Sequence, residues 1–261
     1  IMCGISGIFS KSDNLENILN KFNECLINRG PDNSSIFIEQ RNSFGMGHTR
    51  LSILDLSNRG NQPMYDHSGD WVISFNGEIY NHLKIRDHLA KKTDKKIRWK
   101  SDTDTETILI ANQILGFENT LNLLEGMFAF ALYNKSQNLL YLARDRIGEK
   151  PLYYYHHENK FIFGSDISIF RKVNEINLSI NYDIIPEYLE KGYVRSPFSI
   201  YKFILKLDPG HYLEIKDNFS FLKKKCYWNI KKLITDNLNS RQSPLKKFTD
   251  EKNDLKNILE N

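Results

Sequence analysis

Four stretches of the chain carry polar residues whose types suit chemistry on an amide. Cys3 places a thiol near the N-terminus, and Arg50 lies at the end of a strand-like segment in GHTRLSI. Asn76, Gly77 and Glu78 follow one another in FNGEIYN, and SDTDTE puts acidic residues at the start of a predicted helix. A thiol is a nucleophile, a guanidinium binds a carboxylate, and amide groups stabilise an oxyanion. Together with acids for an ammonium, these groups could hold an amino acid while the thiol attacks its side-chain carbonyl.

The elements that must position these residues are strands and helices in alternation. Residues 3–9 and 71–76 read as strands, and the second ends at Asn76-Gly77, a dipeptide typical of turns. Residues 15–29 carry apolar side chains at helical spacing, which predicts an amphipathic helix. Cys3 and Asn76 therefore lie on predicted strands.

The segments farther along predict an α+β protein built in layers. Four short segments between residues 127 and 165 read as strands, and several of them are apolar at nearly every position, which indicates burial on both faces. Further helices are expected near residues 166–191. This pattern favours two packed sheets with helices on the outside.

The composition limits the class of protein. The chain has 261 residues, 40% of them hydrophobic, which is enough for one large domain. A net charge of +4 does not imply a nucleic-acid partner, and the basic stretch at residues 91–100 reads as a surface loop. No apolar run reaches the roughly 18 residues of a membrane helix, and no signal peptide is recognisable.

Cysteine and histidine usage adds two expectations. The three cysteines form neither an even set nor a metal-binding spacing, which favours the reducing cytoplasm. The seven histidines are scattered singly, so we expect no metal site, and we interpret His48 as structural.

Seven motifs in the chain resemble a known family. They are MCGISGIF, RGPD, GHTRLSILDLSNRGNQPM, NGEIYN, EGMFAFALY, LARDRIGEKPLYY and DPGHYL. In this order they resemble the glutamine-hydrolysing half of asparagine synthetases, a class II glutamine amidotransferase. The resemblance implies an N-terminal-nucleophile hydrolase fold, a four-layer α/β/β/α sandwich. It implies a glutamine amidotransferase type 2 domain over residues 2–228, with a linker and the truncated start of a synthetase domain over 229–261.

The resemblance also implies a role for each candidate residue. Cys3 would be the nucleophile, and its own α-amino group would be the base once Ile1 and Met2 have been removed. A free α-amino group has a pKa of about 7.7–8.0, which suits proton transfer near neutral pH. The other implied site residues are the oxyanion donors Asn76 and Gly77, the carboxylate-binding residues Arg50, Leu51 and Ile53, and the ammonium-binding acids Glu78 and Asp104, with Asp102 as an alternative to Asp104.

The implied partners are L-glutamine and a synthetase domain. The ATP-binding pattern Ser-Gly-Gly-x-Asp-Ser of that synthetase domain does not occur in the chain. We therefore expect no cofactor in this domain, and ATP and Mg only in the missing synthetase domain, whose acceptor substrate is left open. Neither nucleic acid nor a membrane is expected as a partner, and a homodimer is compatible with the sequence. The alternative function is a catalytically silent copy of the fold that acts in interaction or regulation.

Overall fold

The computed structural model describes residues 2–10, 14–93, 96–157, 160–174, 176–216 and 221–240. The chain divides into two compact units, Ile1–Trp228 and Asn229–Asn261. In the second unit, helix α6 (Ile230–Ser240) begins where the sequence predicts a linker, and the Asn229 side chain accepts the Lys231 N–H at 2.9 Å. The helix predicted at the C-terminal end of the chain lies outside the described residues.

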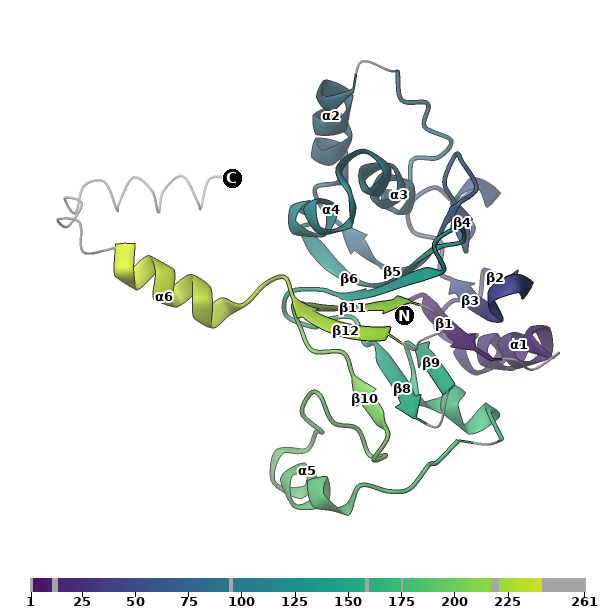
Figure 1. The fold of residues 1–261 in the computed structure, drawn as a ribbon, viewed down its shortest axis with the longest axis vertical. Coiled ribbons are helices and arrows are strands. Elements are labelled where there is room, and N and C mark those ends of the chain that lie inside the picture. Colours follow the sequence, from purple (N-terminus) through teal and green to yellow (C-terminus); the bar gives the residue numbers. More distant parts are fainter. Residues whose placement is uncertain are drawn as a thin grey trace. The chain divides into compact units, whose positions relative to one another are not determined.

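The first unit contains two six-stranded sheets in which all paired strands are antiparallel (Figure 1). The first sheet has the order β10 (Ile204–Lys206), β8 (Tyr153–His157), β9 (Lys160–Gly164), β1 (Gly4–Phe9), β3 (Phe44–Arg50) and β2 (Asn33–Glu39). The second sheet has the order β12 (Phe221–Cys226), β11 (His211–Lys216), β7 (Leu139–Arg144), β6 (Gly126–Asn134), β5 (Trp71–Ile79) and β4 (Met64–Tyr65).

Helices cover the outer faces of both sheets. Helix α1 (Leu15–Leu26) packs on the first sheet, as its predicted apolar stripe requires. The second sheet is covered by three helices, α2 (His82–Lys92), α3 (Asp104–Leu115) and α4 (Phe117–Leu123) (Figure 1). Short 3-10 helices span Gln40–Asn42, Asn58–Gly60, Ile167–Lys172 and Tyr182–Ile184, and the last of these leads into α5 (Ile185–Lys191).

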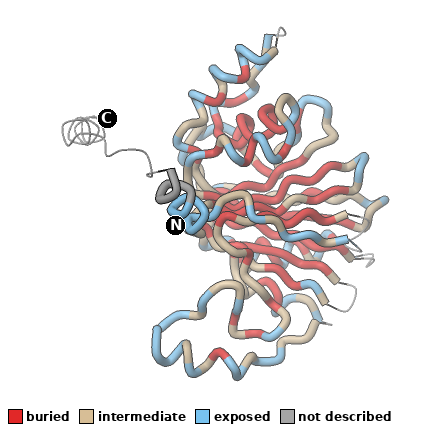
Figure 2. Tube along the Cα trace, turned by 60° about the vertical axis from the view of Figure 1, so that its left-hand side comes forward, coloured by how far each residue is buried: buried red, intermediate tan, exposed pale blue. Residues whose placement is uncertain are grey.

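The central core lies between the two sheets, where Figure 2 shows the longest runs of buried chain. Phe44 of the first sheet meets Tyr133 of the second at 4.3 Å between ring centroids, and it also lies 4.5 Å from Phe9. Each fully buried aromatic ring of this kind stabilises the fold by about 1.5–3 kcal/mol. The predicted α+β sandwich with layers α/β/β/α is therefore confirmed.

The prediction of a turn at Asn76-Gly77 is wrong. Strand β5 continues through both residues to Ile79, because they pair with Ala129 and Phe128 of β6. A Cβ at Gly77 would lie 2.2 Å from the Met127 carbonyl oxygen, so the close pairing itself requires glycine. The chain turns only at Tyr80 and Asn81, just before α2 begins.

The second sheet ends on two unlike edge strands. Strand β12 carries three consecutive lysines, Lys223, Lys224 and Lys225, and it pairs only with β11. At the other edge, β4 has two residues. No helix in the described part of the chain is long and apolar enough to cross a membrane.

Candidate active site

One cavity of about 110 Å³ gathers the predicted site residues. It lies at the ends of β1, β3 and β5 and at the start of α3. A volume of this size holds several water molecules or part of one small polar ligand. All eight predicted residues line it, namely Cys3, Arg50, Leu51, Ile53, Asn76, Gly77, Glu78 and Asp104.

Cys3 lies immediately before β1, with its thiol against Leu51. The Leu51 N–H donates to Sγ at 3.3 Å, and Sγ lies 3.6 Å from the Leu51 carbonyl oxygen. Burial raises the pKa of the Cys3 thiol above its usual 9.0, although the Leu51 N–H and the positive charge of Arg50 lower it. The thiol is therefore protonated at neutral pH, and a reaction at Sγ needs a base nearby.

Gly77 directs its backbone N–H toward the cavity side of β5. The N–H groups of Phe75 and Ile79 donate to Gln62 Oε1 at 2.7 Å and to Asp104 Oδ2 at 2.9 Å. Since alternate N–H groups of a strand point to the same side, the Gly77 N–H lies between these two bonds, on the side away from β6. It is available there to a bound oxygen.

Asn76 adds a second donor. Its side chain is 1% exposed, and its Nδ2 has no hydrogen-bond partner among the described residues. Ser74, two residues earlier on the same face of β5, donates to the Gly47 carbonyl of the first sheet at 3.1 Å, so this face looks toward the sheet of Cys3. A buried donor without a partner costs about 1–3 kcal/mol, and an oxyanion bound at Nδ2 would remove that cost.

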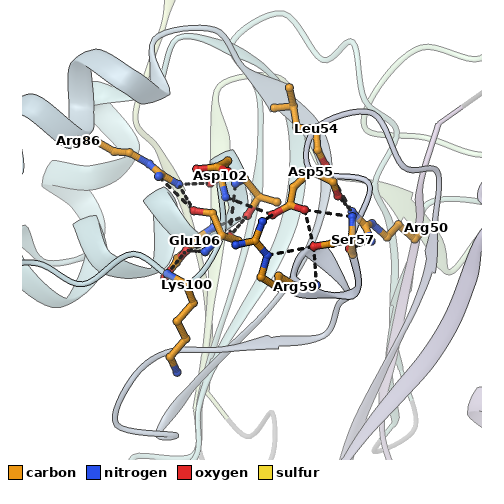
Figure 3. A network of polar contacts seen from close by, with 11 residues as sticks. Arg50, Leu54, Asp55, Ser57, Arg59, Arg86, Lys100, Asp102 and Glu106 are labelled. Atoms are coloured by element: carbon orange, nitrogen blue, oxygen red, sulfur yellow. Dashed lines mark hydrogen bonds and ion pairs between the residues drawn. The ribbon is translucent and has the colours of Figure 1, made fainter.

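Arg50 is buried and holds the segment that follows it (Figure 3). We call residues 51–61 the Arg50 loop. Nη1 donates to the Ser57 carbonyl and to Asn61 Oδ1, both at 2.8 Å, and Nη2 donates to the carbonyls of Leu54 and Asp55. The guanidinium thus shapes the loop in addition to lining the cavity, a role that the sequence does not reveal.

Asp104 is the acid that the structure buries at the cavity. It is 5% exposed, and its carboxylate accepts the N–H groups of Ile79 and Thr105, both at 2.9 Å. Burial raises its pKa from 3.8 to about 6, the two backbone hydrogen bonds oppose this rise, and the charge of Glu78 adds to it. Asp102, the alternative from the sequence, is exposed and does not line the cavity.

Two residues of the RGPD motif, to which the sequence assigns no role, support the site. Arg29 Nε donates to the Cys3 carbonyl at 3.2 Å, and Asp32 accepts the Ser52 N–H at 2.7 Å. The backbone N–H of Asp32 also donates to the Arg50 carbonyl at 2.9 Å. The motif therefore fixes the main chain at Cys3 and at Ser52. Because its residues do not line the cavity, their types alone do not indicate this role.

The sequence predicts a structural role for His48, and Lys150 is not among the predicted site residues. Lys150 lines the cavity, and its Nζ donates to Met2 Sδ at 3.0 Å. His48 is fully buried, its Nε2 lies 3.1 Å from the Phe75 carbonyl, and burial lowers its pKa to about 4. A neutral imidazole fixed between the two sheets fits the structural interpretation. Within the described ranges, no three His, Cys, Asp or Glu side chains cluster as metal ligands would.

Comparison with known proteins identifies the family. The model of a glutamine amidotransferase domain family matches residues 2–228, which is nearly the whole first unit. The chain belongs to this family. It is a class II glutamine amidotransferase domain, and glutamine hydrolysis with transfer of the ammonia is the function of the family.

Curated relatives of this amidotransferase domain carry the name of asparagine synthetases. A putative glutamine-hydrolysing asparagine synthetase of Methanocaldococcus jannaschii is 39% identical over 249 residues, covering 88% of this chain and 47% of that protein. Asparagine synthetase 1 of Bacillus subtilis is 33% identical over 220 residues, covering 82% of this chain and 34% of that protein. The chain thus spans half or less of the length of these relatives.

Solved structures share the fold of the amidotransferase domain. The allosteric regulatory enzyme of purine biosynthesis superposes with a TM-score of 0.64 at 17% identity, over 87% of this chain and 49% of that one. Glutamine phosphoribosylpyrophosphate amidotransferase of B. subtilis gives a TM-score of 0.60 at 18% identity, with the same coverage. The N-terminal-nucleophile hydrolase sandwich expected from the sequence is therefore confirmed.

Proposed function

We propose that this domain hydrolyses L-glutamine to glutamate and ammonia with Cys3 as the nucleophile. The observation that carries the proposal is the cavity itself, where the thiol, an unpartnered amide donor, a guanidinium and a buried carboxylate meet. The cavity contains both signs of charge, and glutamine carries both at its α-carbon. This match favours a zwitterionic amino acid over a singly charged substrate.

The proposed reaction begins with proton transfer. Once Ile1 and Met2 have been removed, the free α-amino group of Cys3 accepts the thiol proton, and Sγ attacks the side-chain carbonyl carbon. The carbonyl electrons move onto oxygen, where Asn76 Nδ2 and the Gly77 N–H donate to the oxyanion. The carbon–nitrogen bond then breaks, the amine returns its proton to the leaving nitrogen, and ammonia departs.

A thioester between Cys3 and the glutamyl group remains after this step. Water attacks its carbonyl carbon while the α-amino group takes a proton from the water, and the same two donors hold the second oxyanion. The carbon–sulfur bond then breaks and releases glutamate, and the α-ammonium group returns its proton to Sγ, which restores the thiol. Every group that moves a proton or stabilises charge in this scheme belongs to the chain, so we propose that the hydrolysis uses no cofactor.

Substrate binding assigns the remaining residues. We propose that Arg50 holds the α-carboxylate through its positive charge and its Nε–H, since both Nη atoms already donate to the Arg50 loop. Leu51 and Ile53 would add backbone contacts, and Asp104 and Glu78 would hold the α-ammonium. Asp104 is favoured over Asp102 because only Asp104 is buried at the cavity. An ammonium bound beside Asp104 would return its raised pKa toward the usual range and keep it ionised.

We propose that the ammonia passes to an ATP-dependent synthetase domain that amidates a carboxylate. The names of the relatives support asparagine synthesis as the activity of the longer protein. ATP and Mg would then act in that domain only. Because the nucleophile is a free thiol, we place the protein in a reducing compartment such as the cytoplasm.

Ammonia release from glutamine tests the proposal directly, with a chain whose N-terminus at Cys3 has been verified by mass spectrometry. We expect release by this chain, covalent labelling of Cys3 by a glutamine-like electrophile, and neither for Cys3→Ala at unchanged thermal stability. A chain that begins with Met2 is a matched control, since it keeps the thiol and lacks the α-amino base. Absence of release from the verified chain would favour the catalytically silent alternative.

A further inference from the structure

Asp55 lies at the centre of the polar network in Figure 3, between two segments of the cavity wall. One segment is the Arg50 loop, to which Asp55 belongs. We call residues 100–103 the Asp104 loop, because they lead directly into Asp104 at the start of α3. Asp55 is not among the residues that line the cavity, and its side chain is 3% exposed.

Within the Arg50 loop, Asp55 fixes the backbone that Arg50 binds. Its Oδ1 accepts the Ser57 N–H at 3.1 Å and the Ser57 hydroxyl at 2.6 Å. Its own carbonyl accepts from Arg50 Nη2. Its φ of 49° lies in the left-handed region, which Asp tolerates because its side chain bonds the local backbone.

The second carboxylate oxygen reaches the Asp104 loop. Oδ2 accepts the N–H of Asp102 at 3.3 Å, two residues before Asp104. Oδ2 also forms an ion pair with Arg59 at 3.4 Å, but Arg59 is 60% exposed, so this pair contributes little. One carboxylate therefore bonds both loops with separate oxygens.

The Asp104 loop is held rigidly on its other side. Glu106 accepts the N–H groups of Lys100 and Ser101, with distances of 2.7–3.1 Å. Arg86 donates to the carbonyls of Ser101 and Thr103 at 2.7–3.2 Å. Because these bonds fix the Asp104 loop, the hydrogen bond from the Asp102 N–H to Asp55 sets the position of that loop relative to the Arg50 loop.

A second hydrogen bond, between two uncharged side chains, also connects these parts of the cavity wall. Gln62 Nε2 donates to Thr105 Oγ1 at 3.3 Å, which joins the chain just beyond the Arg50 loop to α3. Hydrogen bonds to an ionised acceptor are roughly twice as strong as neutral ones, so the Asp55 contact is the stronger of the two.

We propose that Asp55 is a positioning residue that keeps the carboxylate-binding Arg50 and the ammonium-binding Asp104 at a fixed separation. The inference rests on the proposed glutamine site. The two charged groups of glutamine share one carbon atom, so both receptors can engage together only at one spacing. Asp55 thereby makes binding at one end of the substrate strengthen binding at the other.

The test compares the variant Asp55→Asn with unmodified protein, both beginning at Cys3. The substitution keeps the shape of the side chain but replaces one acceptor oxygen by an amide that faces an N–H donor. We expect the KM for glutamine to rise about tenfold, the value of one hydrogen bond to a charged group, with kcat within about twofold. For 4-carbamoylbutanoate, which lacks the α-ammonium, we expect the KM to change by less than about twofold, because only the Arg50 end is engaged.

Asp70→Asn is the matched control. Asp70 also accepts a serine N–H and hydroxyl, those of Ser136, plus one further N–H, from Asn134, and it lies outside the cavity lining. We expect it to lower thermal stability and leave both KM values unchanged. Arg59→Gln removes the exposed ion pair with Asp55 and the hydrogen bond from Arg59 Nε to Ser57 Oγ, and it should behave like unmodified protein.

Two results would overturn the inference while leaving the proposed function intact. One is an unchanged KM for glutamine in Asp55→Asn, and the other is an equal rise for both substrates, which indicates simple loosening of the Arg50 loop. If Asp55→Asn does not fold, Asp55→Ser carries the same expectation, since a hydroxyl can still accept the Ser57 N–H. Failure of unmodified protein to bind or hydrolyse glutamine would overturn the proposed function and this inference with it.

Discussion

The burial of Asp104 makes the stability of the substrate-free protein depend on pH in an unusual direction. A carboxyl group whose pKa is raised from 3.8 to about 6 binds a proton in the folded state at pH values where the unfolded chain does not. The free energy of unfolding therefore falls as pH rises through this range. A carboxylate paired with a cation does the opposite, and the burial of Asp104 is the physical reason for the difference.

The size of this change in the free energy of unfolding follows from the size of the pKa shift. At about 1.4 kcal/mol per pKa unit, a rise from 3.8 to about 6 corresponds to about 3 kcal/mol in total, lost as the pH rises from below the first value to above the second. His48 acts in the opposite direction. Burial lowers its pKa from 6.5 to about 4, so its contribution adds about 3 kcal/mol of stability as pH rises over nearly the same range. The two effects offset each other in the unmodified protein.

Comparison with Asp104→Asn separates the two groups, because the variant keeps His48 and cannot titrate at residue 104. We expect urea unfolding to show that unmodified protein loses about 3 kcal/mol relative to the variant between pH 4 and pH 7. Saturating glutamine should reverse this loss in unmodified protein only, since a bound ammonium stabilises the carboxylate. The KM for glutamine should rise below pH 6 as Asp104 becomes protonated. A stability difference that stays constant with pH would refute the reasoning.

Two further substitutions test the other ends of the cavity. Asn76→Ala should lower kcat about 10²–10³-fold with little change in KM, because its Nδ2 donates only to the oxyanion; steady-state kinetics on folded protein measure this. Gly60→Ala would place a Cβ 2.2 Å from Arg50 Nη2, so it should displace the guanidinium and raise the KM for glutamine about tenfold.

The matched control for Gly60→Ala is Gly69→Ala, where a Cβ meets nothing within 4 Å but φ is +75°. It should cost about 1 kcal/mol of stability and leave the KM unchanged. Equal KM values in both variants would contradict the role given to Arg50. For Asn76→Ala, a parallel rise in KM would show that Asn76 contacts the ground state of the substrate as well.

The layers of the fold were predictable because burial leaves a pattern in the sequence. The apolar stripe of α1 and the continuous apolar runs of β6 to β9 each reflect the surfaces against which they pack. Helix α2 leaves a weaker pattern, because only Ile85 and Leu89 of its eleven residues are buried, too few for a visible apolar stripe. The turn predicted at Asn76-Gly77 failed because pairing with β6 overrides a local preference.

The site was recoverable from motifs, but its internal connections were not. Residue types and the family resemblance pointed to eight residues, all of which line the cavity. The bonds of Arg50 to its own loop, and that of Asp55 to Asp102, join backbone atoms whose positions depend on the folded chain. The identity of a residue does not show which acceptor its backbone N–H will bond. Such contacts are therefore visible only in the folded structure.

The edges of the second sheet bear on how these domains meet one another. A second copy that extended this sheet strand to strand would pair either with β12 or with the two residues of β4. At β12 the lysines of the two copies would meet, although Lys224 and Lys225 already form ion pairs with acidic side chains of their own chain. Like charges repel, and two residues supply too few backbone bonds for a stable junction. Both edges of the second sheet therefore disfavour strand-to-strand association of copies.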